Sequence, residues 1–230
     1  MNGDAWSFEH QVGDARGFHE RELSDPTTRS VWWFEVERPT VVTGSAQPIG
    51  TVDADRAEAA GVEVVRRRSG GGAVWLAPGD ATWVDLVIPA GDPLWDRDVG
   101  RSMHWVGALW SRVLADVGVG DLEVHRAGLV KGPWSDLVCF AGVGPGEVLA
   151  AGRKIVGISQ RRQRAGARFQ CAVLHRWDPS PLVSVLAIPD HDRARLRSEV
   201  ADVAVGAAVD GEDLVASLVG HLEASARIKR

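Results

Sequence analysis

The 230-residue chain is long enough to form one large hydrophobic core or at most two small domains. Its 45% hydrophobic and 25% charged residues are ordinary for a globular protein, and its formal net charge of −5 gives no reason to expect nucleic acid as a partner. Two cysteines exclude a disulfide framework, and neither a signal peptide nor the roughly 18 apolar residues of a membrane span is recognisable. We therefore expect a cytoplasmic protein with no membrane partner and no metal site.

Residues 1–29 are polar and weakly patterned, so residues 1–30 are interpreted as an N-terminal extension and residues 31–230 as a single domain ending in helices. Short strands are predicted over residues 31–36, 40–43, 62–65, 73–76 and 82–88, and a short helix over residues 52–60. Asp53 can cap that helix and Gly61 can end it. Because only a turn at residues 78–80 separates the last two strands, we expect them to pair.

The clearest helix is predicted over residues 98–117, where apolar side chains recur at three- and four-residue spacing before Gly118. Further strands are expected over residues 122–125, 137–141, 147–151, 155–161 and 168–174, and amphipathic helices over residues 192–204 and 211–226. Strand runs combined with long separate helices predict an α+β fold, in which a mixed β-sheet is flanked by helices.

A basic, glycine-rich segment runs from Arg66 to Val74 with the sequence RRRSGGGAV. Three consecutive glycines reach backbone conformations closed to other residues, and their N–H groups can line a concavity that receives an oxyanion. Arginines directly before them can hold a carboxylate or a phosphate. Composition alone favours a plainer structure, a flexible surface loop with solvated arginines. The segment also lacks the spacing of a Walker loop.

Lys154 follows a tight turn expected at Gly152-Arg153 and begins an apolar strand. Its ammonium can polarise a carbonyl if it points into a cleft, although a lone lysine at a strand end is more often exposed. Gly157 removes bulk from the same strand, as expected where a ligand passes close to the backbone.

The two cysteines lie in different contexts. Cys139 belongs to a loop-rich region with basic residues downstream, and a nearby cation favours the nucleophilic thiolate. A cysteine between apolar residues is otherwise most often a small buried side chain. Cys171 lies in the middle of an expected strand and is assigned to the core. Glu147 can act as a base or as a binding carboxylate.

These segments together resemble the catalytic domain of the biotin/lipoate protein ligase family, which includes lipoate–protein ligases and octanoyltransferases. The resemblance rests on RRRSGGGAV followed by GRKIVG at residues 152–157, and it extends over roughly residues 31–185. It implies a mixed sheet flanked by helices, a loop that holds the acyl chain or acyl-adenylate, and a lysine, Lys154, that contacts the acyl carbonyl. The substrate-binding residues implied or suggested by these patterns are Arg66, Arg67, Ser69, Gly70, Gly71, Gly72, Ala73, Glu147 and Gly157.

Two subclasses of this family differ in their chemistry. Ligases activate free lipoate with ATP and Mg²⁺, and they usually carry Asn-Asp before the lysine motif and His-His-Gly after it. This sequence has Gly146-Glu147 and Phe169-Gln170-Cys171 instead. Cysteine-dependent octanoyltransferases are more similar, because they place a cysteine, often followed by Phe, about fifteen residues before the lysine, as Cys139-Phe140 stands here.

The resemblance to the transferases implies a ping-pong reaction that requires no cofactor. The Cys139 thiolate takes an octanoyl or lipoyl group, Lys154 and loop N–H groups stabilise the oxyanion, and a carrier lysine attacks the acyl-cysteine. The expected carriers are lipoyl domains or the glycine-cleavage H protein. Two alternatives are retained: an ATP- and Mg²⁺-dependent lipoate–protein ligase in which Glu147 replaces Asn-Asp, and a non-catalytic relative that binds acyl groups or carrier domains.

Overall fold

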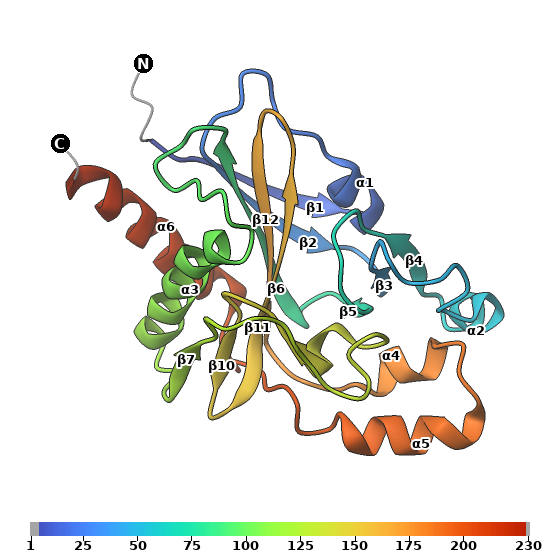
Figure 1. Cartoon of the computed structure of the whole chain (residues 1–230). Coiled ribbons are helices and arrows are strands. Elements are labelled where there is room, and N and C mark those ends of the chain that lie inside the picture. Colours follow the sequence, from blue (N-terminus) through green and yellow to red (C-terminus); the bar gives the residue numbers. More distant parts are fainter. Residues whose placement is uncertain (1–4, 229–230) are drawn as a thin grey trace.

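A seven-stranded mixed sheet forms the centre of the molecule, seen in a computed structural model that describes residues 5–228 (Figure 1). Its strand order is β1-β2-β6-β12-β11-β10-β7. Strands β1 and β2 are parallel, and every other neighbouring pair is antiparallel. The strands are β1 (Ser7–Gly13), β2 (Ser30–Val36), β6 (Ala81–Pro89), β7 (Leu122–Val124), β10 (Val148–Ala150), β11 (Arg153–Arg162) and β12 (Gly166–Leu174).

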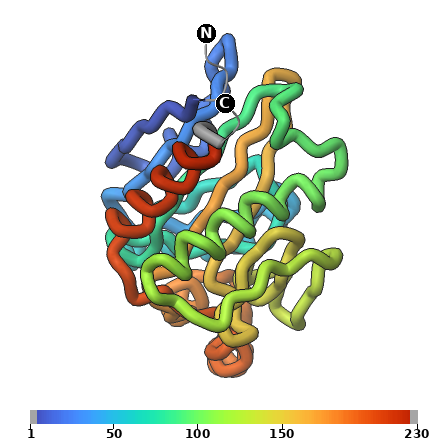
Figure 2. The backbone as a smooth tube through the Cα atoms, turned by 90° about the vertical axis from the view of Figure 1, so that its left-hand side faces the viewer, coloured from blue at the N-terminus to red at the C-terminus, as the bar shows by residue number. Residues whose placement is uncertain are grey.

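The two faces of this sheet bury different elements, because side chains alternate along each strand. On β6, Leu86 and Ile88 belong to the core that includes helices α3 (His104–Asp116) and α6 (Gly211–Ile228). These two helices lie side by side over that face (Figure 2). Trp83 belongs to a different cluster, shared with helix α1 (Ala15–Glu20) and a second sheet. The predicted helix at residues 98–117 is confirmed, with the 3₁₀ turn η1 (Arg101–Met103) as its beginning.

The second sheet has three strands in the order β4-β3-β5. They are β3 (Thr40–Thr43), β4 (Glu63–Arg66) and β5 (Val74–Leu76). Helices α2 (Ala54–Ala59), α4 (Ser180–Val185) and α5 (Asp190–Glu199) pack on this sheet through an apolar cluster of their own. The remaining short elements are β8 (Val130–Lys131), the 3₁₀ turn η2 (Cys139–Ala141) and β9 (Gly142–Val143).

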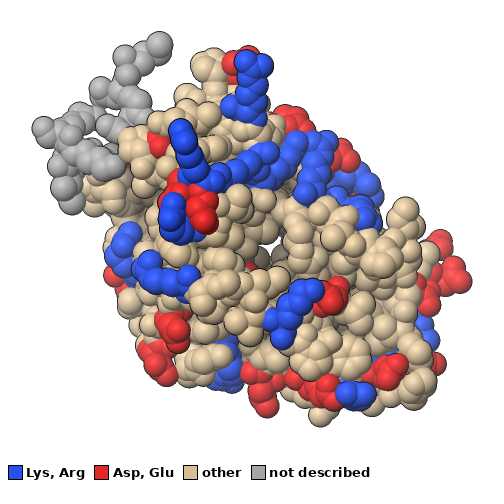
Figure 3. All heavy atoms as spheres, viewed as in Figure 1, with Lys and Arg blue, Asp and Glu red and all other residues tan. Residues whose placement is uncertain are grey.

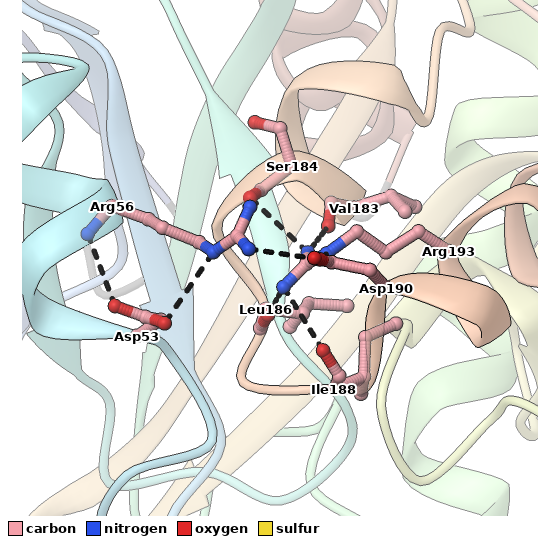
Figure 4. A network of polar contacts seen from close by, with 8 residues as sticks. All are labelled: Asp53, Arg56, Val183, Ser184, Leu186, Ile188, Asp190 and Arg193. Carbon is pink, nitrogen blue, oxygen red and sulfur yellow. Dashed lines mark hydrogen bonds and ion pairs between the residues drawn. The ribbon is translucent and has the colours of Figure 1, made fainter.

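Arg193 of α5 connects helices α2, α4 and α5 (Figure 4). Its guanidinium donates to backbone carbonyls at the end of α4, including those of Ser184 (3.1 Å) and Leu186 (2.7 Å). Such carbonyls have no donor within the helix, so the arginine satisfies groups that would otherwise be unpaired. Asp190 accepts from both Arg193 and Arg56 of α2, and Asp53 caps α2 as predicted.

The segment expected as an N-terminal extension contributes to the main sheet. Strand β1 pairs with β2 along its full length, and helix α1 buries Ala15 and Phe18. Side chains of β1 are almost all exposed, and the strand lies at the sheet edge. An exposed edge strand needs no alternation of apolar and polar residues, which is why the polar sequence gave no strand signal.

Two expectations about strands were wrong. Residues 73–76 and 82–88 do not pair with each other, since β5 pairs with β3 while β2 and β12 occupy both edges of β6. Residues 137–141 form a turn that includes η2 rather than a strand. Most other predicted elements are confirmed within a few residues, and so is the α+β fold with its mixed sheet flanked by helices. Within residues 5–228, no helix is both long and apolar enough to cross a membrane.

Candidate active site

A cavity of about 620 Å³ lies where the small sheet meets strands β11 and β12 of the main sheet. Figure 3 shows a hollow near the centre of the corresponding face. Most residues expected to form the site line this cavity: Arg67, Gly70, Gly71, Gly72, Cys139, Glu147, Lys154 and Gly157. Arg66, Ser69 and Ala73 do not line it, and they make hydrogen bonds to neighbouring segments of the chain.

The glycine loop is packed directly against the turn that carries Cys139. Gly71 has a φ of +98°, which favours glycine, and the Sγ atom of Cys139 lies 3.5 Å from the place where a Cβ on Gly71 would be. A Cβ on Gly72 would lie 2.8 Å from both the Cys139 nitrogen and the Ser135 oxygen. The N–H groups of Gly70, Gly71 and Gly72 donate to no atom of residues 5–228, so they are available to a bound oxyanion.

The arginines beside this loop bind backbone carbonyls. Arg67 is only 5% exposed, and its guanidinium donates to the oxygens of Val42 (3.0 Å), Gly70 (2.7 Å) and Gly72 (2.8 Å). Arg66 donates to two carbonyls of the loop that follows β3. The Arg67 guanidinium therefore holds the glycine loop in shape, and that of Arg66 holds the loop after β3. Both make these contacts where the sequence suggested that they bind a carboxylate.

Ser69 and Ala73 complete the scaffold around the glycines. The Ser69 hydroxyl is 3.0 Å from the Ser159 hydroxyl and donates to the side-chain oxygen of Gln170. The Ala73 N–H donates to the Leu137 carbonyl, and the Ala73 carbonyl accepts from Cys139. These bonds join the glycine loop to the sheet on one side and to the cysteine turn on the other.

The two cysteines occupy opposite environments. Cys139 is half-buried at the start of η2 and lines the cavity. Cys171 is completely buried on β12, and desolvation raises the pKa of its thiol far above the ordinary value. The assignment of Cys171 to the core is confirmed. Both cysteines border the cavity, but Cys171 is completely buried, so Cys139 is the thiol that a ligand there can meet.

Lys154 and Glu147 form a buried ion pair of 2.7 Å beside the cysteine turn, with the lysine 1% and the glutamate 4% exposed. The ammonium also donates to the carbonyls of Cys139 (3.1 Å) and Gly142 (3.0 Å), which uses all three of its N–H bonds. Glu147 accepts from the N–H groups of Gly144 (2.7 Å) and Ile158 (3.0 Å). In this arrangement Lys154 positions the turn that carries Cys139 instead of pointing a free ammonium into the cavity.

Several polar side chains that the sequence analysis did not assign to the site also line the cavity, among them His19, Gln47 and Gln170. Gln47 accepts from the Gly44 N–H and donates to the Asp136 carbonyl, so it connects loops on two sides of the site. His19 is 8% exposed and lies 3.0 Å from Gln170. His19 and Gln47 belong to no motif, and His19 comes from the segment that shows no pattern. Gln170 lies in the segment that stands where the ligases carry His-His-Gly.

Residues 5–222 match the family described as the lipoyl protein ligase A/B catalytic domain. The chain therefore belongs to this family, as the resemblance predicted. It is an acyl-transferring enzyme by that membership and by its likeness to a curated octanoyltransferase.

That relative is octanoyltransferase LipM of Kyrpidia tusciae, which is 31% identical over 196 residues, covering 81% of this chain and 68% of the relative. A solved bi-partite lipoate protein ligase of Thermoplasma acidophilum, studied with its E2 lipoyl domain, superposes with a TM-score of 0.74 at 15% identity, covering 98% of this chain and 84% of that one. The solved structure of a lipoate-protein ligase A bound with ATP superposes with a TM-score of 0.65 at 18% identity, covering 99% of this chain and 93% of that one. At such identities the two structures establish the shared fold.

Proposed function

We propose that the protein transfers an octanoyl or lipoyl group to a lysine of a carrier domain through a thioester on Cys139, with no requirement for ATP or metal. The single observation that carries this proposal is the position of Cys139. Its thiol is half-buried on the wall of the cavity and lies against Gly71, whose loop offers unpaired N–H groups.

In the first half-reaction, the Cys139 thiolate adds to the carbonyl carbon of an acyl thioester. The carbonyl oxygen becomes an oxyanion, which N–H groups of Gly70 to Gly72 can stabilise. Collapse of this intermediate breaks the bond to the donor sulfur and leaves the acyl group on Cys139. The departing thiol carries away the proton that the Cys139 thiol gave up.

In the second half-reaction, the neutral amine of a carrier lysine attacks the acyl-cysteine. The amide bond forms as the carbon–sulfur bond breaks, and the amine proton replaces the acyl group on the thiol. Lys154 supports both steps as a positioning residue, because it holds the carbonyls of Cys139 and Gly142 on either side of the turn. This role differs from the direct contact to the acyl carbonyl that the resemblance implies.

The geometry around Glu147 favours the transferase over the ATP-dependent ligase. One carboxylate oxygen is shared by Lys154 and the Gly144 N–H, and the other accepts from the Ile158 N–H. A carboxylate bound on this many sides serves the fold of the turn and is poorly placed to take over the function of the ligases' Asn-Asp.

We take the carrier to be a lipoyl domain or the glycine-cleavage H protein. The structural relative from Thermoplasma acidophilum was studied with an E2 lipoyl domain, which supports a lipoyl domain as the first carrier to test.

The decisive assay mixes the protein with an octanoylated carrier and an unmodified acceptor domain, without ATP. The proposal predicts octanoyl transfer to the acceptor lysine, loss of transfer in Cys139→Ser, and retention in Cys171→Ser. Acylation that appears only after free lipoate and ATP are added, and that survives Cys139→Ser, would identify a ligase. Binding of the carrier without turnover of either donor would identify a non-catalytic relative.

A further inference from the structure

One wall of the cavity carries a buried histidine with an unused hydrogen-bond donor. His19 of α1 lines the cavity, is 8% exposed, and its Nε2 atom is buried without a partner among the described residues. Buried polar atoms are rarely left unpaired, because an unmade hydrogen bond is unfavourable. His19 therefore brings to the cavity wall a buried polar atom that no residue in the described part of the chain satisfies.

The hydrogen-bond network assigns a proton to this atom. The Ser69 hydroxyl donates to the side-chain oxygen of Gln170, so the amide nitrogen of Gln170 is turned toward His19 Nδ1, 3.0 Å away. An amide nitrogen only donates, and Nδ1 must accept. Burial, together with the charges of Arg168 and Arg67, lowers the pKa of His19 to about 3. At neutral pH the ring is uncharged, and its proton is on Nε2.

Neighbouring residues hold the ring in place. Arg168, itself 1% exposed, donates to the carbonyls of Phe18 (2.6 Å) and Arg21 (2.8 Å), which flank His19 in the chain. The imidazole lies against Trp83, with ring centroids 4.5 Å apart. His19 thus presents a fixed donor rather than a mobile side chain.

The sheet register relates His19 to the cysteine turn. A Cβ on Gly157 of β11 would lie 3.1 Å from the Phe140 ring and 3.6 Å from Lys154 Cε. Gly157 pairs with Ala172 of β12, which pairs with Trp83 of β6, the residue whose ring packs against His19. The order β6-β12-β11 puts His19 one to two strands from Gly157, or about 5–10 Å. An acyl chain attached at Cys139 would reach His19 with its distal carbons.

We propose that His19 is a specificity-determining residue that donates a hydrogen bond from Nε2 to an acceptor atom on the distal part of the acyl chain. This inference rests on the proposed function, because it assumes that the cavity holds the acyl group. A saturated octanoyl tail has no acceptor and leaves the donor unpaired. A chain with a distal hydroxyl oxygen, or with the weaker acceptor sulfur of a dithiolane, satisfies it.

The test measures competition among octanoyl, lipoyl and 8-hydroxyoctanoyl thioesters of one carrier for acylation of Cys139, read by intact-protein mass. The wild type is expected to prefer at least one acceptor-bearing chain over octanoyl, and the two such chains distinguish sulfur from oxygen. His19→Phe keeps a ring against Trp83 and should reduce this preference about tenfold. The matched control is His10→Phe, since His10 also stacks on a tryptophan, Trp33, but does not line the cavity. No preference in the wild type, or an equal preference in His19→Phe, would overturn the proposal.

A second measurement uses the unaltered protein and is independent of Cys139 chemistry. In ¹⁵N-histidine NMR, His19 should be the Nε2-protonated tautomer at pH 7, and 8-hydroxyoctanoate should shift this N–H resonance much more than octanoate does. Equal shifts would contradict the assignment. If no thioester forms with any donor, the proposed transfer mechanism fails, and the NMR result still decides the role of His19.

Discussion

Gly72 lies so close to the backbone of Cys139 that a Cβ at position 72 would be 2.8 Å from the Cys139 nitrogen. Backbone atoms cannot move away as the end of a flexible side chain can, so Gly72→Ala must displace the cysteine turn. We expect it to destabilise the protein by about 1–3 kcal/mol and to reduce acyl transfer about a hundredfold. Chemical denaturation and the transfer assay measure the two effects.

Gly70→Ala is the matched control for that change. A Cβ on Gly70 would meet nothing within 4 Å, and the residue has no positive φ. Its stability and activity should stay close to those of the wild type. Equal losses in the two variants would mean that the loop needs glycine for flexibility, and not for its close contact with Cys139.

Arg67→Met should lower the stability of the protein, because Arg67 holds the glycine loop. Its effect on substrate binding should be smaller. The change removes hydrogen bonds to the carbonyls of Val42, Gly70 and Gly72, and unpaired buried carbonyls cost about 1–3 kcal/mol each. We expect a stability loss of about 3 kcal/mol or more by urea denaturation. Arg68→Ala removes only an exposed pair with Glu22 and should cost less than about 1 kcal/mol. A fully stable Arg67→Met with a higher KM would instead indicate a direct substrate contact.

The buried pair of Lys154 and Glu147 should show strong energetic coupling. Lys154→Met leaves the carboxylate buried without its counter-ion, which costs about 3–5 kcal/mol. Adding Glu147→Gln removes that uncompensated charge. The stability loss of the double variant should therefore be smaller than the sum of the losses in the two single variants. A double-mutant cycle by denaturation measures this coupling. Strictly additive losses would show that the two residues act independently.

His19 should make the stability of the protein depend on pH. Its pKa falls to about 3 in the folded state, so between pH 3 and 6.5 the unfolded chain binds the additional proton. The contribution of the neutral His19 to the free energy of unfolding is complete above pH 6.5, and it is lost as the pH falls from 6.5 towards 3. Relative to His19→Phe, the wild type should lose about 2 kcal/mol between pH 7 and pH 5. Parallel stability curves for the two proteins would contradict a neutral His19.

The sequence allowed prediction of most strands and of the residues that meet around Cys139, because the loop at residues 66–74 and the segment at 152–157 carry recognisable motifs. It could not show which way Arg67 points, since carbonyls of its own loop compete with a ligand for the guanidinium. The sequence also could not identify His19 as a residue of the site. Its partner Gln170 lies 151 positions away, and only the folded sheet brings the two together.

The proposed transfer depends on the half-buried thiol of Cys139. The most direct measurement is intact-protein mass spectrometry after mixing the protein with an octanoylated carrier in the absence of ATP, followed by hydroxylamine. We expect an octanoyl adduct that hydroxylamine removes and that maps to Cys139. The adduct should be absent from Cys139→Ser but present in Cys171→Ser. Carrier acylation without any such adduct, dependent on ATP and unaffected by Cys139→Ser, would contradict the proposed transfer.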